Sequence, residues 1–258
     1  MSHQPPPVVI GVLGCSGGLG ASTLTVALAL TAARRGASAL AVDADLTGGG
    51  LDVTACAEHL PGLRWGDLAQ ARGAIDGDAL WRELPAVAGA RILSAGPSGA
   101  SQPGPSLLSG VLGSLRTEAD LVVVDLPASG ATEQSLGLCD AIVVLAGVTA
   151  RHLADATAVV AQAMRHCPDL WLLVRHGARA SELPEVLAAH LDLPLTGRWG
   201  QDHRLGADAE RGRPPGERAR SPLAVLCERV LLDVAWRGGA TEGVPTAALF
   251  PRRRGVAS

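Results

Sequence analysis

Three residue types are missing from this 258-residue chain, which contains no lysine, no tyrosine and no asparagine. All 22 of its Lys/Arg residues are therefore arginine. A GC-rich genome explains a bias of this kind. Whatever its origin, the bias excludes any chemistry that needs a lysine amine or an asparagine amide, whether from this chain or from a second copy of it.

Long apolar runs are also missing, and none approaches the ~18 residues of a membrane-spanning helix. The first residues, Met1–Pro7, show neither a basic segment nor a cleavage site, so no signal peptide is predicted. We therefore expect a cytoplasmic protein. The five cysteines are far apart and odd in number, which predicts free thiols and no metal site: Cys15, Cys56, Cys139, Cys167 and Cys227.

Apolar runs alternate with helical patterns along the chain. A length of 258 residues with 47% hydrophobic residues suits one large α/β domain, or at most two small ones. Short apolar strands separated by helices predict a doubly wound, mostly parallel sheet flanked by helices. We expect this domain over residues 1–237 and a loose tail over 238–258. The expected strands are Val8–Leu13, Ala39–Val42, Arg91–Ser94, Leu121–Val124, Ala141–Leu145, Leu170–Val174 and Pro194–Trp199; the expected helices are Ser22–Arg35, Ser106–Ala119, Arg151–His166, Ser181–His190 and Leu223–Val234.

A Gly-rich segment, residues 14–23, lies between the first expected strand and the first helix. This is the context of a phosphate-binding loop, whose backbone N–H groups and helix dipole attract an anion. The hydroxyl of Ser22 is placed to ligate Mg²⁺, and Thr23 to touch the α-phosphate. A Gly-rich turn alone is a weak signal, because a merely structural turn looks the same.

Acidic residues at two strand ends strengthen the signal. Asp43 and Asp45 follow the second strand, and Asp125 ends the apolar strand Leu121–Val124. Carboxylates at the carboxyl edge of a sheet can hold hydrated Mg²⁺ or orient a water molecule. Each aspartate alone fits a strand-end cap equally well, but the three in this order favour a nucleotide site.

These segments resemble those of MinD/ParA ATPases, P-loop NTPases whose deviant Walker A loop reads Lys-Gly-Gly-x-Gly-Lys-Thr-Thr. The Asp-x-Asp segment, the Asp-x-Pro after the Leu121–Val124 strand and the Cys139–Val144 element are similar too. The resemblance covers about residues 8–236. The chain resembles the CpaE/TadZ-like branch, which includes septum-site-determining proteins, more closely still. This closer resemblance is at residues 48–52, 61–65 and 193–195.

The resemblance implies ATP and Mg²⁺ as cofactors and assigns residues to them. The implied nucleotide contacts are Gly17, Gly18, Leu19, Gly20, Ala21, Ser22, Thr23 and Arg175. The implied Mg²⁺ site is Ser22, with Asp43 and Asp125 acting through water, and Asp45 positions the attacking water.

The departures from the family pattern are at its functional positions. The signature lysine that reaches across a dimer falls on Ser16, the P-loop lysine on Ala21, and the asparagine that reads adenine on Arg175. Because charge stabilisation carries most of phosphoryl transfer, we expect slow or absent hydrolysis. Arg151 or Arg175 could replace a lysine, although each also fits a solvated surface arginine.

The resemblance implies a positioning or assembly regulator, homodimeric, with a protein partner in Tad pilus secretion or septum placement. It would be cytoplasmic or peripheral at the inner face of the membrane or a cell pole. The alternatives are an active ATPase stimulated by DNA or membrane, with an arginine in place of lysine, and a nucleotide-free scaffold. The Arg-rich region 198–258 could contact DNA or lipid, but a solvated face explains it as well.

Overall fold

The computed structural model describes residues 8–46, 49–69, 75–96, 104–128, 131–177 and 182–238. The expected tail beyond residue 238, the segment Met1–Pro7 and the residues Thr47 and Gly48 lie outside these ranges. In the described part of the chain, no helix is long and apolar enough to cross a membrane.

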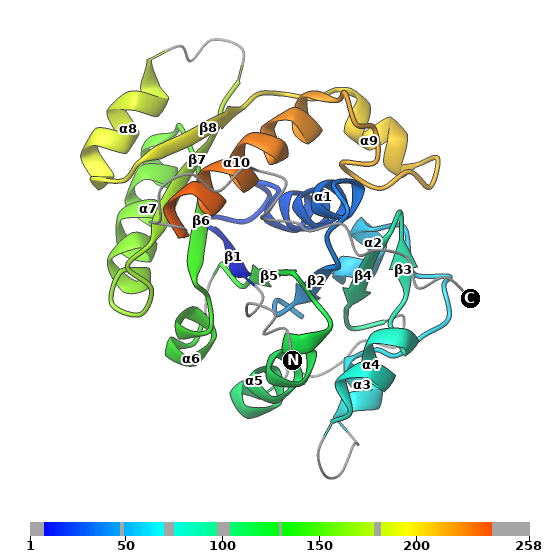
Figure 1. The fold of residues 1–258 in the computed structure, drawn as a ribbon. Coiled ribbons are helices and arrows are strands. Elements are labelled where there is room, and N and C mark those ends of the chain that lie inside the picture. Colours follow the sequence, from blue (N-terminus) through cyan, green and yellow to red (C-terminus); the bar gives the residue numbers. More distant parts are fainter. Residues whose placement is uncertain are drawn as a thin grey trace.

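Eight strands of the described residues form one sheet in the order β3-β4-β2-β5-β1-β6-β7-β8 (Figure 1). All neighbouring strands are parallel except β3, which is antiparallel to β4. The predicted doubly wound fold is therefore confirmed. The strands are β1 (Val8–Gly14), β2 (Ala39–Asp43), β3 (Ala86–Val87), β4 (Ala90–Leu93), β5 (Leu121–Leu126), β6 (Ala141–Gly147), β7 (Leu170–Arg175) and β8 (Leu195–Trp199).

Helices cover both faces of the sheet. α1 packs against α10 on one face, while α5, α7 and α8 cover the other (Figure 1). The bounds of the longer helices are α1 (Ala21–Arg34), α5 (Pro105–Ser114), α7 (Ala150–Ala163), α8 (Leu183–Leu191) and α10 (Pro222–Gly238). The short helices are α2 (Leu51–Thr54), α3 (Trp65–Leu68), α4 (Gly77–Glu83), α6 (Glu133–Gly137) and α9 (Arg204–Ala209).

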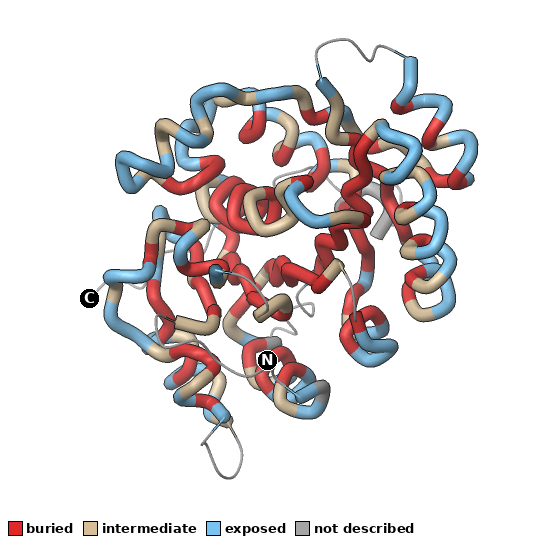
Figure 2. The backbone as a smooth tube through the Cα atoms, turned by 180° about the vertical axis from the view of Figure 1, so that it is seen from behind, coloured by how far each residue is buried: buried red, intermediate tan, exposed pale blue. Residues whose placement is uncertain are grey.

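The central strands have apolar side chains on both faces, which is why their sequences are continuous apolar runs. On β1, Val9 and Leu13 face the α5/α7 side, whereas Ile10 and Val12 face the α1/α10 side. The buried backbone accordingly runs through the middle of the molecule (Figure 2). Burial on both faces fixes β1 and β5 in the centre of the sheet.

Helix α1 is buried over Leu24–Ala32 because the sheet lies on one side of it and α10 on the other. It ends at Arg34, and the predicted glycine cap, Gly36, follows with a φ of 95°, the left-handed conformation that glycine adopts without strain. The long helix expected over Ser106–Ala119 is shorter, since α5 ends at Ser114 and a 3₁₀ turn, Leu115–Thr117, follows.

Candidate functional site

The Gly-rich loop connects β1 to α1 and forms an open turn. Gly18 and Gly20 have φ values of 77° and 101°. This is a left-handed backbone conformation that glycine adopts freely and that residues with a side chain adopt only with strain. A Cβ on Gly17 or Gly18 would meet no atom within 4 Å, so the loop backbone is bare on that side. At Gly17 and Gly18 the loop therefore presents only main-chain atoms to whatever lies in front of it.

The first turn of α1 has no side-chain cap, because its N-cap residue is Gly20. The amides of a first turn have no partner inside the helix, so they are available to an anion. They open onto a cleft of about 390 Å³. Its lining includes the predicted contacts Gly17, Gly18, Leu19, Gly20, Ala21, Ser22 and Thr23, together with Asp45, Thr54 and Asp125.

Two of the predicted aspartates are neighbours across the sheet. Asp43 on β2 pairs in register with Asp125 on β5, at the carboxyl ends of both strands. Asp45 and Asp125 line the cleft, and all three aspartates line a contiguous hollow of about 150 Å³ with Ser22. The structure thus brings the expected Mg²⁺ residues together beside the first turn of α1.

Burial, together with the charges of Asp43 and Asp45, raises the pKa of Asp125 to about 7. A hydrogen bond from the Ser22 hydroxyl opposes this shift. Burial likewise raises the pKa of Asp43 to about 6. The repulsion between these neighbouring carboxylates would be relieved by a cation. Carboxylate oxygens beside a hydroxyl are therefore suitable ligands for a hydrated Mg²⁺.

Asp43 also has a structural role that sequence reasoning missed. Its Oδ2 accepts hydrogen bonds from the Leu51 amide and the Ser94 hydroxyl, both at 2.7 Å, and the Trp65 indole N–H donates to its main-chain oxygen at 2.7 Å. Asp43 therefore links the segments that contain Leu51, Trp65 and Ser94 to the end of β2 by hydrogen bonds. Any contact of Asp43 with a cation uses a carboxylate that is already anchored.

The motifs around residues 50 and 64 meet in the same buried network. The Ser94 hydroxyl lies 3.0 Å from Asp52 Oδ1, and Asp52 Oδ2 lies 3.9 Å from Arg64 Nε. The Arg64 guanidinium also donates to main-chain oxygens, among them those of Ala57 and Leu60. Asp52 and Arg64 are thus structural residues under the site, and nothing in the spacing of the sequence reveals this pairing.

No arginine is among the described residues that line the cleft or the hollow. Ser16, where the signature lysine would be, donates a hydrogen bond of 2.6 Å to Asp155 on α7. Arg151 lies 3.9 Å from the same carboxylate, and its side chain is 89% exposed. Arg151 is therefore at the rim of the loop and not within the cleft.

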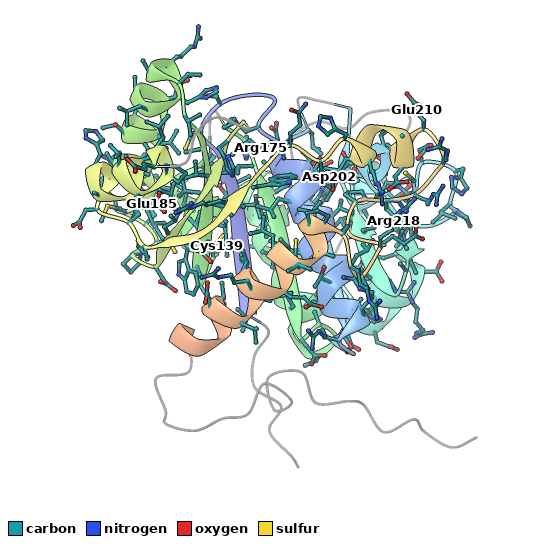
Figure 3. The ribbon with its side chains drawn as sticks, turned by 90° about the horizontal axis from the view of Figure 1, so that it is seen from above. Cys139, Arg175, Glu185, Asp202, Glu210 and Arg218 are labelled. Carbon is teal, nitrogen blue, oxygen red and sulfur yellow. The ribbon has the colours of Figure 1, made fainter. Side chains whose placement is uncertain are left out.

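Arg175, a predicted nucleotide contact, lies at the carboxyl end of β7 and is not among the described residues that line the cleft. Its guanidinium stacks on the Trp199 ring, 4.1 Å from the ring centroid, at the carboxyl ends of β7 and β8. Figure 3 shows Arg175 near Asp202 at this end of the sheet, and the two charges interact. Trp199 touches the phosphate loop, since a Cβ on Gly20 would lie 3.0 Å from its ring. Sequence reasoning placed Arg175 here but missed Trp199.

Three arginines of the basic region form ion pairs with described acidic residues. Arg198 pairs with Glu185 of α8, and Arg213 and Arg218 both pair with Asp208. For these three arginines the ion pairs favour the solvated-face interpretation.

The sequence has relatives but no matching family model. Two uncharacterized proteins from two strains of Mycobacterium tuberculosis are 35% identical over 242 residues, which is 91% of this chain. The chain spans 66% of the length of these relatives, which thus contain residues that this sequence does not.

Solved structures decide the fold. A ParA family ATPase from Chlorobium tepidum superposes with a TM-score of 0.75 over 88% of this chain and 98% of its own, at 17% identity. The septum site-determining protein MinD of Pyrococcus horikoshii, solved with Mg-ADP, gives 0.71 over 90% and 98%, at 20% identity. The chain has the MinD/ParA fold. The MinC:MinD complex of Aquifex aeolicus contains a further MinD/ParA-type chain that superposes, with a TM-score of 0.71 over 92% of this chain and 97% of its own, at 17% identity.

Proposed function

We propose that this MinD/ParA-like chain binds ATP with Mg²⁺ and hydrolyses it slowly or not at all. One observation supports both parts of the proposal. The cleft combines an uncapped helix start, a bare glycine loop and two aspartates with no basic side chain among the described residues that line it. Backbone amides and a metal ion suffice to bind phosphates, but the cation that stabilises the transition state is missing.

The chain's own residues divide the work as follows. The amides at the start of α1 would bind phosphate oxygens. The Ser22 hydroxyl would ligate the ion, and Asp43 and Asp125 would hold it through water. Asp45, at the cleft wall, orients the attacking water. A bound Mg²⁺ would supply positive charge beside the phosphates, but it would not replace the lysine that adds to it in the family pattern.

Calorimetric titration of ATP with Mg²⁺ tests the binding. We expect saturable binding at or below millimolar nucleotide, abolished in Asp125→Ala. A matched control is Asp78→Ala, which removes an exposed aspartate of α4 that pairs only with Arg82. No binding at millimolar ATP would overturn the proposal, and turnover at ordinary ATPase rates would overturn its second part.

Thermal unfolding with and without ATP and Mg²⁺ tests the alternative of a nucleotide-free scaffold. We expect ATP with Mg²⁺ to raise the melting temperature of the wild type but not of Asp125→Ala. If neither protein responded, the fold would serve as a scaffold without nucleotide.

An active ATPase with an arginine in the place of lysine is a second candidate, favoured by the position of Arg151 at the rim of the loop. Arg151 is held only by an exposed pairing 3.9 Å from Asp155. In this case DNA or lipid vesicles would stimulate hydrolysis, and Arg151→Ala would abolish the stimulation. Arg165→Ala, an exposed arginine just beyond the end of α7, is the control.

We further propose that the nucleotide controls a homodimer that recruits a protein of a secretion or division machinery, as a CpaE/TadZ-like regulator would. The support is the likeness to MinD, one example of which has been solved in a complex with MinC. Light scattering with and without ATP and Mg²⁺ measures the dimer. A mass that stays monomeric in both conditions would contradict this part.

A further inference from the structure

Four residues line both the cleft in front of the Gly-rich loop and the hollow that adjoins it. Three of them are the predicted site residues Ser22, Asp45 and Asp125. The fourth is Thr54 of α2, to which no motif of the sequence pointed. The loop glycines line only the cleft, whereas Asp43 lines only the hollow. Thr54 therefore lies at the boundary between the expected phosphate site and the expected ion site.

Hydrogen bonds at its first residue hold α2 in place beside this boundary. The Leu51 amide donates to Asp43 Oδ2 at 2.7 Å and to the Ser94 hydroxyl oxygen at 2.8 Å. The Ala55 amide, just past the helix, donates to the Leu51 oxygen at 2.9 Å and closes the single turn. Because the turn is tied to a carboxylate of the hollow, Thr54 has a fixed position at the wall of the cavity.

The hydroxyl of Thr54 has no hydrogen-bond partner among the described residues, and the residue is half-buried. Two other hydroxyls near the site are already engaged, since Ser16 donates to Asp155 and Ser94 donates to Asp43. A threonine hydroxyl at the wall of a cavity can donate one hydrogen bond to an anion. Thr54 thus offers a donor that the fold does not use.

The other residues at the boundary do not take this donor role. The ionised carboxylates of Asp45 and Asp125 only accept hydrogen bonds and repel phosphate oxygens. The Ser22 hydroxyl is assigned to the ion and is hydrogen-bonded to Asp125. Because Asp45 is assigned to the water that attacks the terminal phosphate, the phosphate beside Asp45 and Thr54 is the terminal one. ADP has no group at this place.

We propose that the Thr54 hydroxyl donates a hydrogen bond to the terminal phosphate of ATP, and that this contact makes the site bind ATP more tightly than ADP. The inference rests on the proposed nucleotide binding and gives that site a specificity-determining residue. Because the chain has no lysine, a neutral hydroxyl takes part of the recognition of the terminal phosphate. A hydroxyl adds no charge, so it distinguishes ATP from ADP without restoring the catalysis that a lysine supports.

Calorimetric titrations of the full chain with ADP and with the β,γ-imido analogue of ATP, each with Mg²⁺, test the proposal. Thr54→Val removes the hydroxyl and keeps the shape of the side chain. We expect it to bind the ATP analogue about tenfold more weakly, as the loss of a hydrogen bond to a charged group implies. Its affinity for ADP should stay unchanged. Thr54→Ser, which keeps the hydroxyl, should bind both nucleotides like the wild type.

The same substitution at another threonine is the matched control. Thr157→Val removes an exposed hydroxyl of α7 that bonds to the Leu153 oxygen of its own helix, and it should leave both affinities unchanged. Thermal unfolding without ligand checks that Thr54→Val folds like the wild type.

The outcomes separate the role of Thr54 from the nucleotide site. An equal loss of affinity for ADP and the ATP analogue in Thr54→Val, or no loss for either, would overturn the role of Thr54 alone. A loss in Thr54→Ser as large as in Thr54→Val would do the same. Failure of both nucleotides to bind the wild type would overturn the nucleotide site itself.

Discussion

The Ser16 hydroxyl donates a hydrogen bond of 2.6 Å to Asp155, and thereby joins the phosphate loop to α7. The bond spans 139 positions of the chain. It occupies the place where the family pattern has a lysine, so the loop is held there by a neutral donor and a carboxylate. Breaking it should free the loop from α7 and leave Ser22, Asp45 and Asp125 in the lining of the cleft.

We expect Ser16→Ala to lower the free energy of unfolding by about 1 kcal/mol, because a hydrogen bond to a charged acceptor is lost. Asp155→Asn in the Ser16→Ala background should then cost little more, and urea unfolding of the four proteins of this cycle measures the coupling. Thr157→Ala is the control, since that hydroxyl bonds only to its own helix at the oxygen of Leu153. Additive losses would show that Ser16 and Asp155 are not coupled.

The buried pair of Asp52 and Arg64 should matter far more to stability than an exposed pair. Arg64 is 8% exposed and Asp52 2%. We expect Arg64→Met to cost about 3 kcal/mol or more, because a buried carboxylate and several main-chain oxygens lose their partner. Arg82→Met, which breaks the exposed pair with Asp78, should leave the midpoint of urea unfolding unchanged. Equal effects of the two variants would contradict the buried network.

The contrast between these pairs shows what the sequence could and could not predict. β2 and β5 are apolar runs that indicate buried strands, and the positions of Asp43 and Asp125 at their ends followed from them. Ser94 joins Asp43 and Asp52 by contacts 51 and 42 positions apart, which leave no periodic signal. The sequence thus predicts the residues that follow a local pattern, such as the aspartates at strand ends, and not the contacts between distant segments.

The short helices were missed for a related reason. α3 has only four residues, and it is set by the Trp65 indole bonded to Asp43 and by the Asp67 carboxylate bonded to the Arg64 amide. A single helical turn has no amphipathic period to detect, because nucleation is costly and tertiary contacts must stabilise it. Trp199 was missed similarly, since only the folded sheet places it against Gly20.

Two glycines of the loop should respond differently to the same substitution. Gly20→Ala places a Cβ 3.0 Å from the Trp199 ring at a φ of 101°, so we expect a loss of about 2 kcal/mol in unfolding free energy. A Cβ on Gly17 meets no atom within 4 Å, so Gly17→Ala should unfold like the wild type. Thermal unfolding without ligand measures both, and a Gly17→Ala protein as unstable as Gly20→Ala would contradict the open loop.

The raised pKa of Asp125 predicts how stability changes with pH. Its pKa is about 7 in the folded protein, against an ordinary value of 3.8. Between these values the folded state binds the extra proton, so stability falls as the pH rises through this window, and the penalty is complete above about pH 7. Because one pKa unit corresponds to about 1.4 kcal/mol, the cost is at most about 4 kcal/mol.

Asp125→Asn removes that ionisation, so we expect the variant to be more stable than the wild type by about 4 kcal/mol at pH 8, by about half of that at pH 5.5, and nearly equal to it below about pH 4. The comparison is made as the difference between the two proteins, so that contributions of all other groups cancel. Asp120→Asn is a poor control, since Asp120 caps the Ser38 amide, whereas the exposed Asp78→Asn changes no buried charge. Mg²⁺ requires the ionised carboxylate, so its nucleotide complex should bind more tightly as the pH rises from 6 to 8. A stability difference between wild type and Asp125→Asn that stayed constant across this range would show that Asp125 does not titrate there.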